Sequence, residues 1–306
     1  MSIRLFSEKL YWALRKRSPI KKQKTYEDWL AKGYLCTPKV SFVIQSHNKS
    51  TAVMHIVKQL RTYPDAEIIV IDDGSENHHA KRLARFLQGG NEFLIKANDL
   101  YEIVMYDKAI RFANGDYIVL LQDDDMISDM DWLDRGLGYF DKYPDMVILG
   151  GYHGLKYEID GGHKVVCPSV VENHVPVEFQ FVHTVDRAPM LLKRSLYMQY
   201  LKHLNLSFAP LTCDDGELCL RAWISGLKVG WYNAGFKSLM AGGIRIWNNH
   251  LLCVQETRNS PKLHEMYHRY VDEITEKVQT ANATLVSRQQ LLSKKRIPPY
   301  QKRRPD

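Results

Sequence analysis

The chain has 306 residues, of which 45% are hydrophobic, and this suits one large α/β unit with two lobes and helical extensions. Its formal net charge of +7 is unevenly spread, because residues 1–24 carry +7, residues 288–306 carry +6 and residues 25–287 carry −6. An acidic body with basic ends argues against a nucleic-acid groove through the core. It fits tails that contact an anionic surface or keep the protein soluble.

The N-terminal region contains no pattern typical of a secretion signal. Arg4, Glu8, Lys9 and Arg15 interrupt its apolar residues, and nowhere in the chain do about 18 apolar residues run together. Residues 2–17 instead predict a short amphipathic helix, which lies on a membrane or packs on the body or on another subunit. The five cysteines form no CxxC pair, so neither a zinc knuckle nor a disulfide framework is indicated. We expect a cytoplasmic protein, with peripheral membrane contact through the basic termini as an alternative.

The sequence divides into a basic N-terminal helical extension (1–37), a main domain (38–255) and a C-terminal helical extension with a basic tail (256–306). In residues 38–125 of the main domain, strands alternate with helices. The strands are expected at Val40–Ile44, Glu67–Ile71, Phe93–Lys96 and Tyr117–Leu121, and the helices at Thr51–Tyr63, His78–Leu87 and Tyr101–Ala113. This alternation predicts a mostly parallel sheet with helices on both faces. Ligands of such sheets bind beyond the carboxyl ends of the strands, where the polar turns 45–48, 72–75 and 122–125 lie.

Residues 126–255 form a less regular second half. Helices are expected at Asp131–Lys142 and Asp215–Ser225, strands at Met146–Gly150 and Lys228–Tyr232, and a hairpin turn at Gly161–Gly162. Residues 260–293 predict a charged helix, and no internal repeat is present.

Three consecutive acids, Asp123, Asp124 and Asp125, follow the apolar strand that ends at Leu121. Packed carboxylates repel each other, and a hard divalent cation is one of the few partners that makes such a cluster favourable. A cluster that caps the helix beginning near Asp131 would explain one acid but not three. The sequence therefore predicts Mg²⁺ or Mn²⁺ that holds a substrate diphosphate.

Four motifs together resemble the inverting family 2 type of GT-A fold glycosyltransferases, over residues 39 to about 250. They are the opening strand and loop Val40–Asn48, the second loop Ile71–Ser75, the acidic run Gln122–Asp125 and the acidic segment Cys213–Arg221. The resemblance implies a Rossmann-like, mostly parallel central sheet flanked by helices. It also implies a nucleotide-binding half at 38–125 and an acceptor half at 126–255.

The resemblance assigns one group of residues to the nucleotide-sugar donor. Asp73 is expected to accept a hydrogen bond from the N3–H of a uracil ring, although an Asp-Asp-Gly turn also explains it. His47 either stacks on the base or caps the following helix. The whole predicted donor set is Gln45, Ser46, His47, Asn48, Asp73, Asp107 and Asp123.

A second group is assigned to the metal. We expect Asp124 as the principal ligand, Asp125 as a direct or water-mediated ligand, and Asp123 near the ribose or the metal. The overlapping frame, in which Asp123 and Asp125 form the pair, stays open. His250 is a candidate ligand of the metal or the diphosphate, although a lone histidine is more often a surface or core residue.

Asp215 is the candidate general base, with Asp214 as a neighbour that tunes or orients it. An inverting transfer needs one carboxylate to take the acceptor proton, and a helix N-terminus is a rigid platform for that carboxylate. An ordinary helix cap is the alternative role for either acid. Glu217 is expected to contact Arg221 at helical spacing. Asp186 and Arg187 are expected to pair with each other or to contact sugar hydroxyls.

The resulting hypothesis is a metal-dependent, inverting glycosyltransferase with a nucleotide-sugar donor, expected to be a UDP-sugar, and a glycan or glycoconjugate acceptor. A sugar nucleotidyltransferase is one rival, but its glycine-rich phosphate loop is missing because residues Gln45–Ser50 contain no glycine. A catalytically silent subunit that binds a nucleotide sugar or glycan is the other. Nucleic acid is not an expected partner, and neither the oligomeric state nor the linkage is indicated by the sequence.

Overall fold

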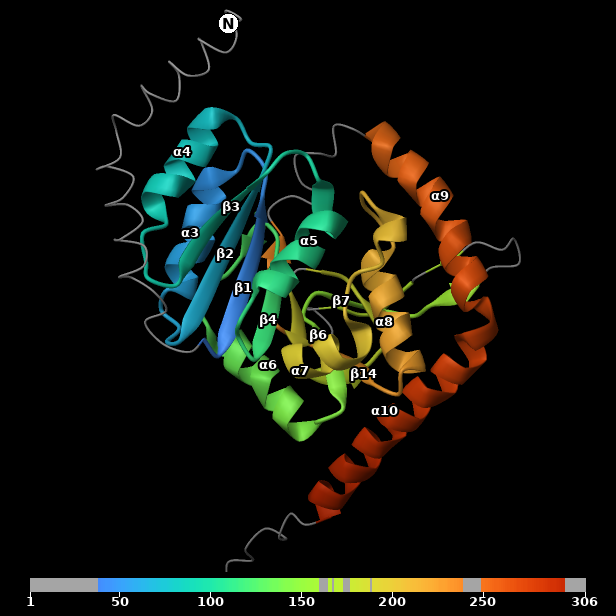
Figure 1. The fold of residues 1–306 in the computed structure, drawn as a ribbon. Helices are drawn as coiled ribbons and strands as arrows, with labels where there is room; N and C mark the ends of the chain where they lie inside the picture. The colour runs from blue at the N-terminus through green and yellow to red at the C-terminus, as the bar shows by residue number, and fades with distance from the viewer. Residues whose placement is uncertain are drawn as a thin grey trace, which may run out of the picture.

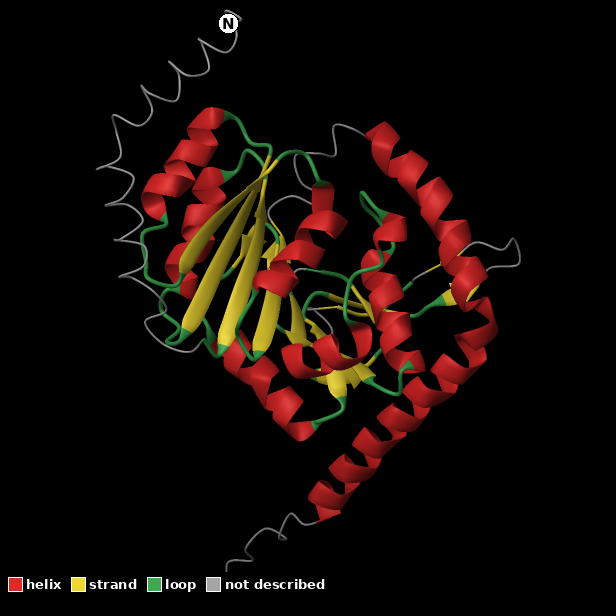
Figure 2. Ribbon diagram, in the orientation of Figure 1, coloured by secondary structure: helices red, strands yellow, loops and turns green. Residues whose placement is uncertain are grey.

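The central element of the fold is an eight-stranded sheet (Figures 1 and 2). The computed structural model describes residues 38–159, 165–166, 168–172, 177–187, 189–238 and 249–294. Within them the strand order of this sheet is β11-β14-β6-β13-β4-β1-β2-β3. The predicted helix at 2–17 and the predicted turn at Gly161–Gly162 lie outside the described residues.

The first half of the fold alternates strands and helices as predicted. Its elements are β1 (Val40–Ser46), α3 (Ser50–Leu60), β2 (Ala66–Asp73), α4 (Asn77–Phe86), β3 (Glu92–Ala97), α5 (Tyr101–Phe112) and β4 (Tyr117–Leu121). The four strands are mutually parallel, with Val40 opposite both Ala66 and Tyr117. Every residue of β1 is buried, as expected for a parallel strand covered on both faces.

The handedness of the connections separates the helices between the two faces of the sheet. The chain moves from β1 outward to β3 through α3 and α4, and then returns past β1 to β4 through α5. Because such crossovers are right-handed, α3 and α4 lie on one face and α5 on the other, as Figure 1 shows. The reversal of direction creates a topological switch point between β1 and β4. The carboxyl ends of these two strands are therefore the expected ligand site.

The second half extends the sheet with strands of both directions. After α6 (Asp131–Lys142) come β6 (Met146–Gly150), β11 (Phe179–Phe181), β13 (Met190–Lys193) and β14 (Lys228–Tyr232). Strand β13 is antiparallel to both of its neighbours, β4 and β6, while β14 is parallel to β6. The predicted mostly parallel sheet is thus confirmed, and β13 is an antiparallel insertion at its centre.

Short elements surround this second half. Small sheets are formed by β7 (His153–Leu155) with β10 (Ser169–Glu172) and β12 (Thr184–Val185), by β5 (Asp125–Met126) with β15 (Lys237–Ser238), and by β8 (Glu158–Ile159) with β9 (Val165–Val166). The short helices are α7 (Arg194–Leu196), η1 (Tyr197–Leu201) and η2 (Leu206–Phe208), and the longer helix is α8 (Asp214–Ile224).

The C-terminal helices pack along the second half next to α8 (Figure 1). They are α9 (Asn249–Tyr267), η4 (His268–Tyr270) and α10 (Val271–Lys294), so α9 crosses residue 255. The Asn282 side chain on α10 accepts from the Phe181 N–H at 2.9 Å and donates to the Phe181 carbonyl at 2.8 Å. Asn282 thereby bonds the N–H and the carbonyl of Phe181 in the way that a further strand beside β11 would. No helix within the described residues is long and apolar enough to cross a membrane.

A buried carboxylate fixes the start of β1 against the turn that precedes β4. Glu67 on β2 is fully buried and accepts from the Ser41 hydroxyl and from the Asn114 N–H, the latter at 2.9 Å. The Ser41 hydroxyl in turn accepts from the Gly115 N–H at 2.8 Å. A Cβ at Gly115 would lie 2.6 Å from the Ser41 nitrogen, so the turn can approach β1 this closely only with glycine.

We expect Glu67→Ala to lower the free energy of unfolding by at least about 2 kcal/mol, because buried donors lose their acceptor. Urea denaturation measures this change. Asp116→Ala, which removes an exposed acid from the same turn, is the control and should stay within about 0.5 kcal/mol of the wild type. Equal stabilities for the two variants would contradict the role of Glu67.

Candidate active site

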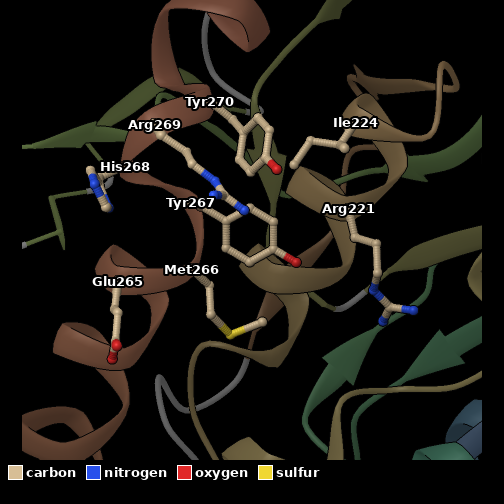
Figure 3. Close-up of a pocket in the computed structure, with 8 residues that line it drawn as sticks. All are labelled: Arg221, Ile224, Glu265, Met266, Tyr267, His268, Arg269 and Tyr270. Carbon is tan, nitrogen blue, oxygen red and sulfur yellow. The ribbon is translucent and has the colours of Figure 1, made fainter.

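A cleft of about 550 Å³ lies where the end of α8 meets the junction of α9 and α10 (Figure 3). Its lining includes Arg221, Glu265, Tyr267 and Arg269. None of the predicted site residues that the structure describes lines this cleft. The Arg221 guanidinium and the Tyr267 hydroxyl both bind the buried Glu217 carboxylate, so these two groups stabilise the end of α8. The predicted contact between Glu217 and Arg221 is confirmed.

The predicted donor residues other than Asp107 lie at the carboxyl ends of β1, β2 and β4, where hydrogen bonds join three loops. The His47 N–H donates to Asp123 Oδ2 at 2.8 Å, and the His47 ring lies 2.7 Å from the Asp73 carbonyl oxygen. The Asn48 N–H donates to the Ser75 hydroxyl at 2.8 Å, and Asn48 Oδ1 accepts from the Glu76 N–H at 2.8 Å. His47 and Asn48 therefore hold the three loops in register.

Among the residues that the structure describes, two buried oxygen atoms at this edge have no hydrogen-bond partner. They are the Ser46 hydroxyl at the end of β1 and Asp72 Oδ1 at the end of β2. Because buried polar groups are normally satisfied, these atoms mark a place where a polar ligand would be stabilised. Gln45, the residue before Ser46, is also buried.

Lys49 partly neutralises the acidic run that follows β4. Its ammonium lies 3.0 Å from Asp123 Oδ1, and both side chains are largely buried. Burial raises the pKa of the Asp123 carboxyl, while Lys49 and the His47 N–H oppose this increase. Asp123 is therefore already paired, and the sequence analysis did not include Lys49 among the site residues.

Asp124 and Asp125 are the other two acids of the run. Both are buried, and Asp125 Oδ2 accepts from the Gln122 N–H at 2.9 Å. Burial raises the pKa of the Asp125 carboxyl well above its ordinary value, and repulsion from Asp124 and Asp123 adds to this effect. In the described part of the chain, no three His, Cys, Asp or Glu side chains are placed to hold a metal by themselves. One or two carboxylates suffice, however, when substrate phosphates complete the coordination, so these acids fit a divalent ion that arrives with a diphosphate.

Two predicted donor residues have structural partners instead. Both carboxylate oxygens of the fully buried Asp73 accept N–H groups at the start of α5, from Leu100 at 2.8 Å and from Tyr101 at 3.0 Å. Each oxygen can accept a second hydrogen bond, so these contacts leave room for a further donor, but a uracil ring would have to reach a carboxylate that is fully buried.

The other is Asp107, whose carboxylate accepts from the Leu204 N–H at 3.1 Å and from Arg111 at 3.2 Å. Asp107 therefore joins α5 to the segment before η2. Its oxygens are already engaged, and we leave it out of the proposed donor site.

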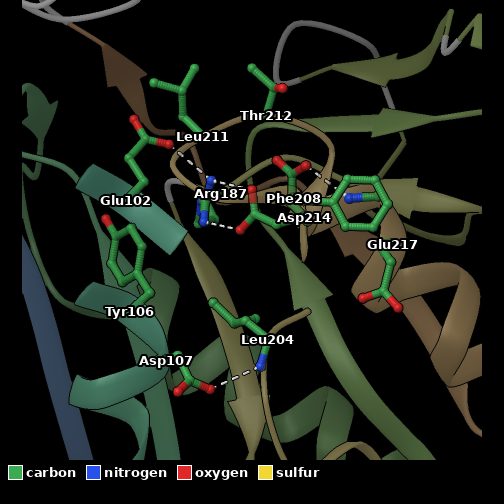
Figure 4. A network of polar contacts seen from close by, with 12 residues as sticks. Glu102, Tyr106, Asp107, Arg187, Leu204, Phe208, Leu211, Thr212, Asp214 and Glu217 are labelled. Carbon is green, nitrogen blue, oxygen red and sulfur yellow. Dashed lines mark hydrogen bonds and ion pairs between the residues drawn. The ribbon is translucent and has the colours of Figure 1, made fainter. Parts of the chain in front are cut away.

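A buried ion-pair network positions the second acidic motif (Figure 4). Asp214 and Asp215 lie in the first turn of α8, where the helix dipole favours negative charge. Asp214 is fully buried, and both of its oxygens bind the Arg187 guanidinium, which also binds Glu102 on α5 at 2.9 Å. Arg187 was predicted to pair with Asp186 or to contact sugar, but Asp186 instead pairs with His153 at 2.9 Å.

Asp215, the next residue, is half-buried, and its carboxylate bonds to the residue that follows it. Its Oδ1 accepts from the Gly216 N–H at 2.8 Å, and no other hydrogen bond to this carboxylate is present among the described residues. Burial and the nearby Asp214 charge raise the pKa of the Asp215 carboxyl to about 7, although Arg187 opposes the increase. A carboxylate with a pKa near neutrality is suited to accept a proton and release it again.

Tyr106 on α5 connects the two acidic clusters. Its hydroxyl donates to the carbonyl of Leu121, the last residue of β4, at 2.8 Å. The Arg187 guanidinium lies 5.0 Å from the centre of its ring (Figure 4). Burial raises the pKa of Tyr106 well above its ordinary value, and the charges of Asp125 and Asp123 add to that increase. The acids after β4 and the Arg187–Asp214 pair therefore flank one buried side chain.

The loop before α8 is held in an unusual backbone conformation by α9. Thr212 and Cys213 have positive φ angles of 77° and 64°. The buried Asn259 side chain donates to the carbonyls of Phe208, Leu211 and Thr212 at 2.7–3.2 Å. No local pattern points to Asn259, because its partners lie about fifty positions away in the chain. His250, the remaining predicted metal ligand, is the second residue of α9, and its side chain is not among those that the structure describes.

Comparisons with known proteins agree with this fold. Among solved structures, the mannosyltransferase PcManGT from Pyrobaculum calidifontis, in complex with GDP-Man and Mn²⁺, is similar over 93% of this chain and 90% of its own, at 13% identity and a TM-score of 0.51. GalNAc-T7 with UDP, GalNAc and Mn²⁺ is similar over 65% of this chain and 43% of its own, at 15% identity and a TM-score of 0.52. These likenesses support the predicted GT-A fold. No curated protein sequence matches the chain.

The sequence profile described as Glycosyl transferase family 2 matches residues 41–197. The match covers about half of the chain and contains β1 to β4, the acids after β4, and Arg187. The chain therefore belongs to glycosyl transferase family 2 and is a glycosyltransferase.

Proposed function

We propose that the protein transfers a sugar from a nucleotide-sugar donor to a hydroxyl of a glycan or glycoconjugate, with inversion at the anomeric carbon. The observation that carries this proposal is Asp215, a half-buried carboxylate in the first turn of α8 with a pKa of about 7. Its neighbour Asp214 is fully engaged with Arg187, so Asp215 is the acid of this pair that can exchange a proton.

In the proposed reaction, Asp215 accepts the proton of the acceptor hydroxyl as that oxygen attacks the anomeric carbon. The new carbon–oxygen bond forms on the face opposite the departing nucleoside diphosphate, which takes the electron pair of the bond that breaks. A single displacement of this kind inverts the anomeric centre and needs one base rather than a covalent intermediate. The role of Arg187 is to fix Asp214, and through it the first turn of α8.

The donor is proposed to bind at the carboxyl ends of β1, β2 and β4. The unpartnered Ser46 hydroxyl and Asp72 Oδ1 offer polar contacts, and Lys49 places a cation beside the acids. Asp124 and Asp125 would hold Mg²⁺ or Mn²⁺ there, and the ion supplies positive charge that stabilises the departing diphosphate. A UDP-sugar is the expected donor.

Neither rival function is favoured by a specific observation. A sugar nucleotidyltransferase would use a glycine-rich loop after the first strand, whereas the loop here is fixed by His47 and Asn48 side-chain and backbone contacts. A silent binding subunit would not require Asp215, a carboxylate whose pKa is raised toward neutrality, next to Asp214, which is fully paired with Arg187.

Asp215→Asn should lower kcat by at least about a hundredfold, because the amide cannot accept the proton. Binding of UDP measured by calorimetry should be nearly unchanged. Asp131→Asn, which alters an exposed acid in the first turn of α6, is the matched control. Wild-type turnover by Asp215→Asn would remove the assignment of the base.

Asp124→Ala should abolish the part of UDP binding that depends on Mn²⁺. For the wild type, a cognate nucleotide at a hundredfold excess over Kd stabilises the fold by about 2.7 kcal/mol. The increase in Tm with UDP can therefore be compared with the increase with GDP, and the nucleotide that gives the larger increase is the one carried by the donor. Asp129→Ala removes a nearby exposed acid as a control. The metal role is refuted when Asp124→Ala and the wild type show the same Mn²⁺-dependent shift in Tm.

Arg187→Met should lower kcat and move the pH profile. In the wild type, kcat/KM is expected to increase as pH rises through about 7, because Asp215 must be ionised to act. Loss of the Arg187 charge raises the pKa of Asp215 further, so the increase should occur at higher pH. Arg187→Lys keeps the charge but not the two-pronged contact, and it should move the profile less. A folded Arg187→Met variant with an unmoved profile would contradict this positioning role.

A further inference from the structure

A second cleft, of about 510 Å³, lies between α3 and α4, on the face of the sheet opposite α5 (Figure 1). Its lining consists of Met54 from α3 and of His78, Lys81, Arg82, Arg85 and Phe86 from α4. Met54 and Phe86 are partly buried against the core and form an apolar floor. The cleft therefore combines three permanent cations with an apolar surface.

None of the residues that line this cleft is acidic. Neither α3 nor α4 contains an acidic residue, and Lys81 and Arg85 are exposed. Within the described residues, neither Lys81 nor Arg85 has an ion-pair partner, while Arg82 donates to the Thr51 hydroxyl at 2.9 Å. The acid next to the cleft, Glu76, faces His78 at 3.3 Å. This positive region lies on a body whose residues 25–287 carry a net charge of −6, so it is a local exception.

The spacing of the cations directs them to one place. His78, Lys81 and Arg85 are separated by three and four positions, so they share one face of α4. Met54 on α3 lies across the cleft from them. Side chains on such a face can contact one anion together, which isolated surface lysines cannot do.

We propose that this cleft binds a phosphate-bearing anion. Lys81, Arg82 and Arg85 contact the phosphate oxygens, and Met54 and Phe86 contact the apolar part of the ligand. Arginine provides paired donors that match phosphate geometry, and lysine adds a point charge. A soluble phosphorylated compound and a phospholipid headgroup share this chemistry, and the volume lies within the range of ligand pockets.

The cleft differs from the candidate active site in position and in residues. Lys81 and Arg85 lie in the second and third turns of α4, away from the loop at 73–76 that ends at the sheet edge. None of the residues proposed for the donor, the metal or the base lines it. The proposal therefore does not depend on the reaction that the protein catalyses.

The test compares the full chain with the double variant Lys81→Gln/Arg85→Gln. The control, Lys142→Gln/Lys202→Gln, removes the same charge from exposed positions on α6 and after η1. One arm titrates inorganic pyrophosphate in the presence of EDTA, so that no divalent ion recruits it to the acids after β4. The other arm measures co-sedimentation with phosphatidylcholine vesicles that contain or lack phosphatidylserine.

The cleft variant should bind at least one of these probes about thirtyfold more weakly than the wild type. This value follows because each of the two cations removed contributes a factor of roughly five. The control should bind as the wild type does, and both variants should keep the wild-type Tm and glycosyl transfer. Loss of pyrophosphate binding alone identifies a soluble ligand, and loss of vesicle binding alone identifies a lipid headgroup. Equal losses in the cleft and control variants, or no binding of either probe by the wild type, would overturn the proposal.

Discussion

The buried contact between Arg187 and Asp214 is the interaction on which the candidate site depends. It joins the loop before β13 to the first turn of α8, and the further bond to Glu102 extends it to α5. Removal of one partner of such a buried pair costs about 3–5 kcal/mol, because the other charge is left unpaired. The pair therefore fixes the first turn of α8, the bond to Glu102 ties Arg187 to α5, and the position of Asp215 follows from these contacts.

The donor edge is organised differently, through short-range contacts between loops. His47 and Asn48 join the ends of β1, β2 and β4 with backbone and side-chain hydrogen bonds, and Lys49 adds an ion pair to Asp123. Loops that are tied to one another in this way lose less conformational entropy when a ligand binds. The ion pair with Lys49 also offsets part of the repulsion among the three consecutive carboxylates.

Local patterns in the sequence predicted most elements of the fold, and β4, α6, β6 and β14 have the predicted bounds. Strand and helix periodicity is a property of neighbouring residues, so one sequence contains it. The antiparallel insertion of β13 and the partner of Arg187 depend on contacts between distant segments, and no local pattern encodes them. For the same reason Asp107 was assigned to the donor, whereas its carboxylate binds Leu204, 97 positions away. The acidic motifs were found, but Lys49 was not, and Arg187 was expected to pair with Asp186 rather than with Asp214.

The two acidic motifs share one electrostatic arrangement. In each, one acid is paired with an internal cation, Asp123 with Lys49 and Asp214 with Arg187, and an acid close by in the chain has a raised pKa. Neutralising the first acid limits the repulsion that the second must overcome to ionise. The second acid, Asp125 or Asp215, is then free to bind a cation or a proton. Tyr106 contacts both motifs, with its hydroxyl bonded to the Leu121 carbonyl and its ring 5.0 Å from the Arg187 guanidinium. Each motif nevertheless has its own electrostatic environment: besides burial, the charges that shift the pKa of Asp215 are those of Asp214, Arg187 and Asp186, and those that shift the pKa of Asp125 are Asp124, Asp123 and Lys49.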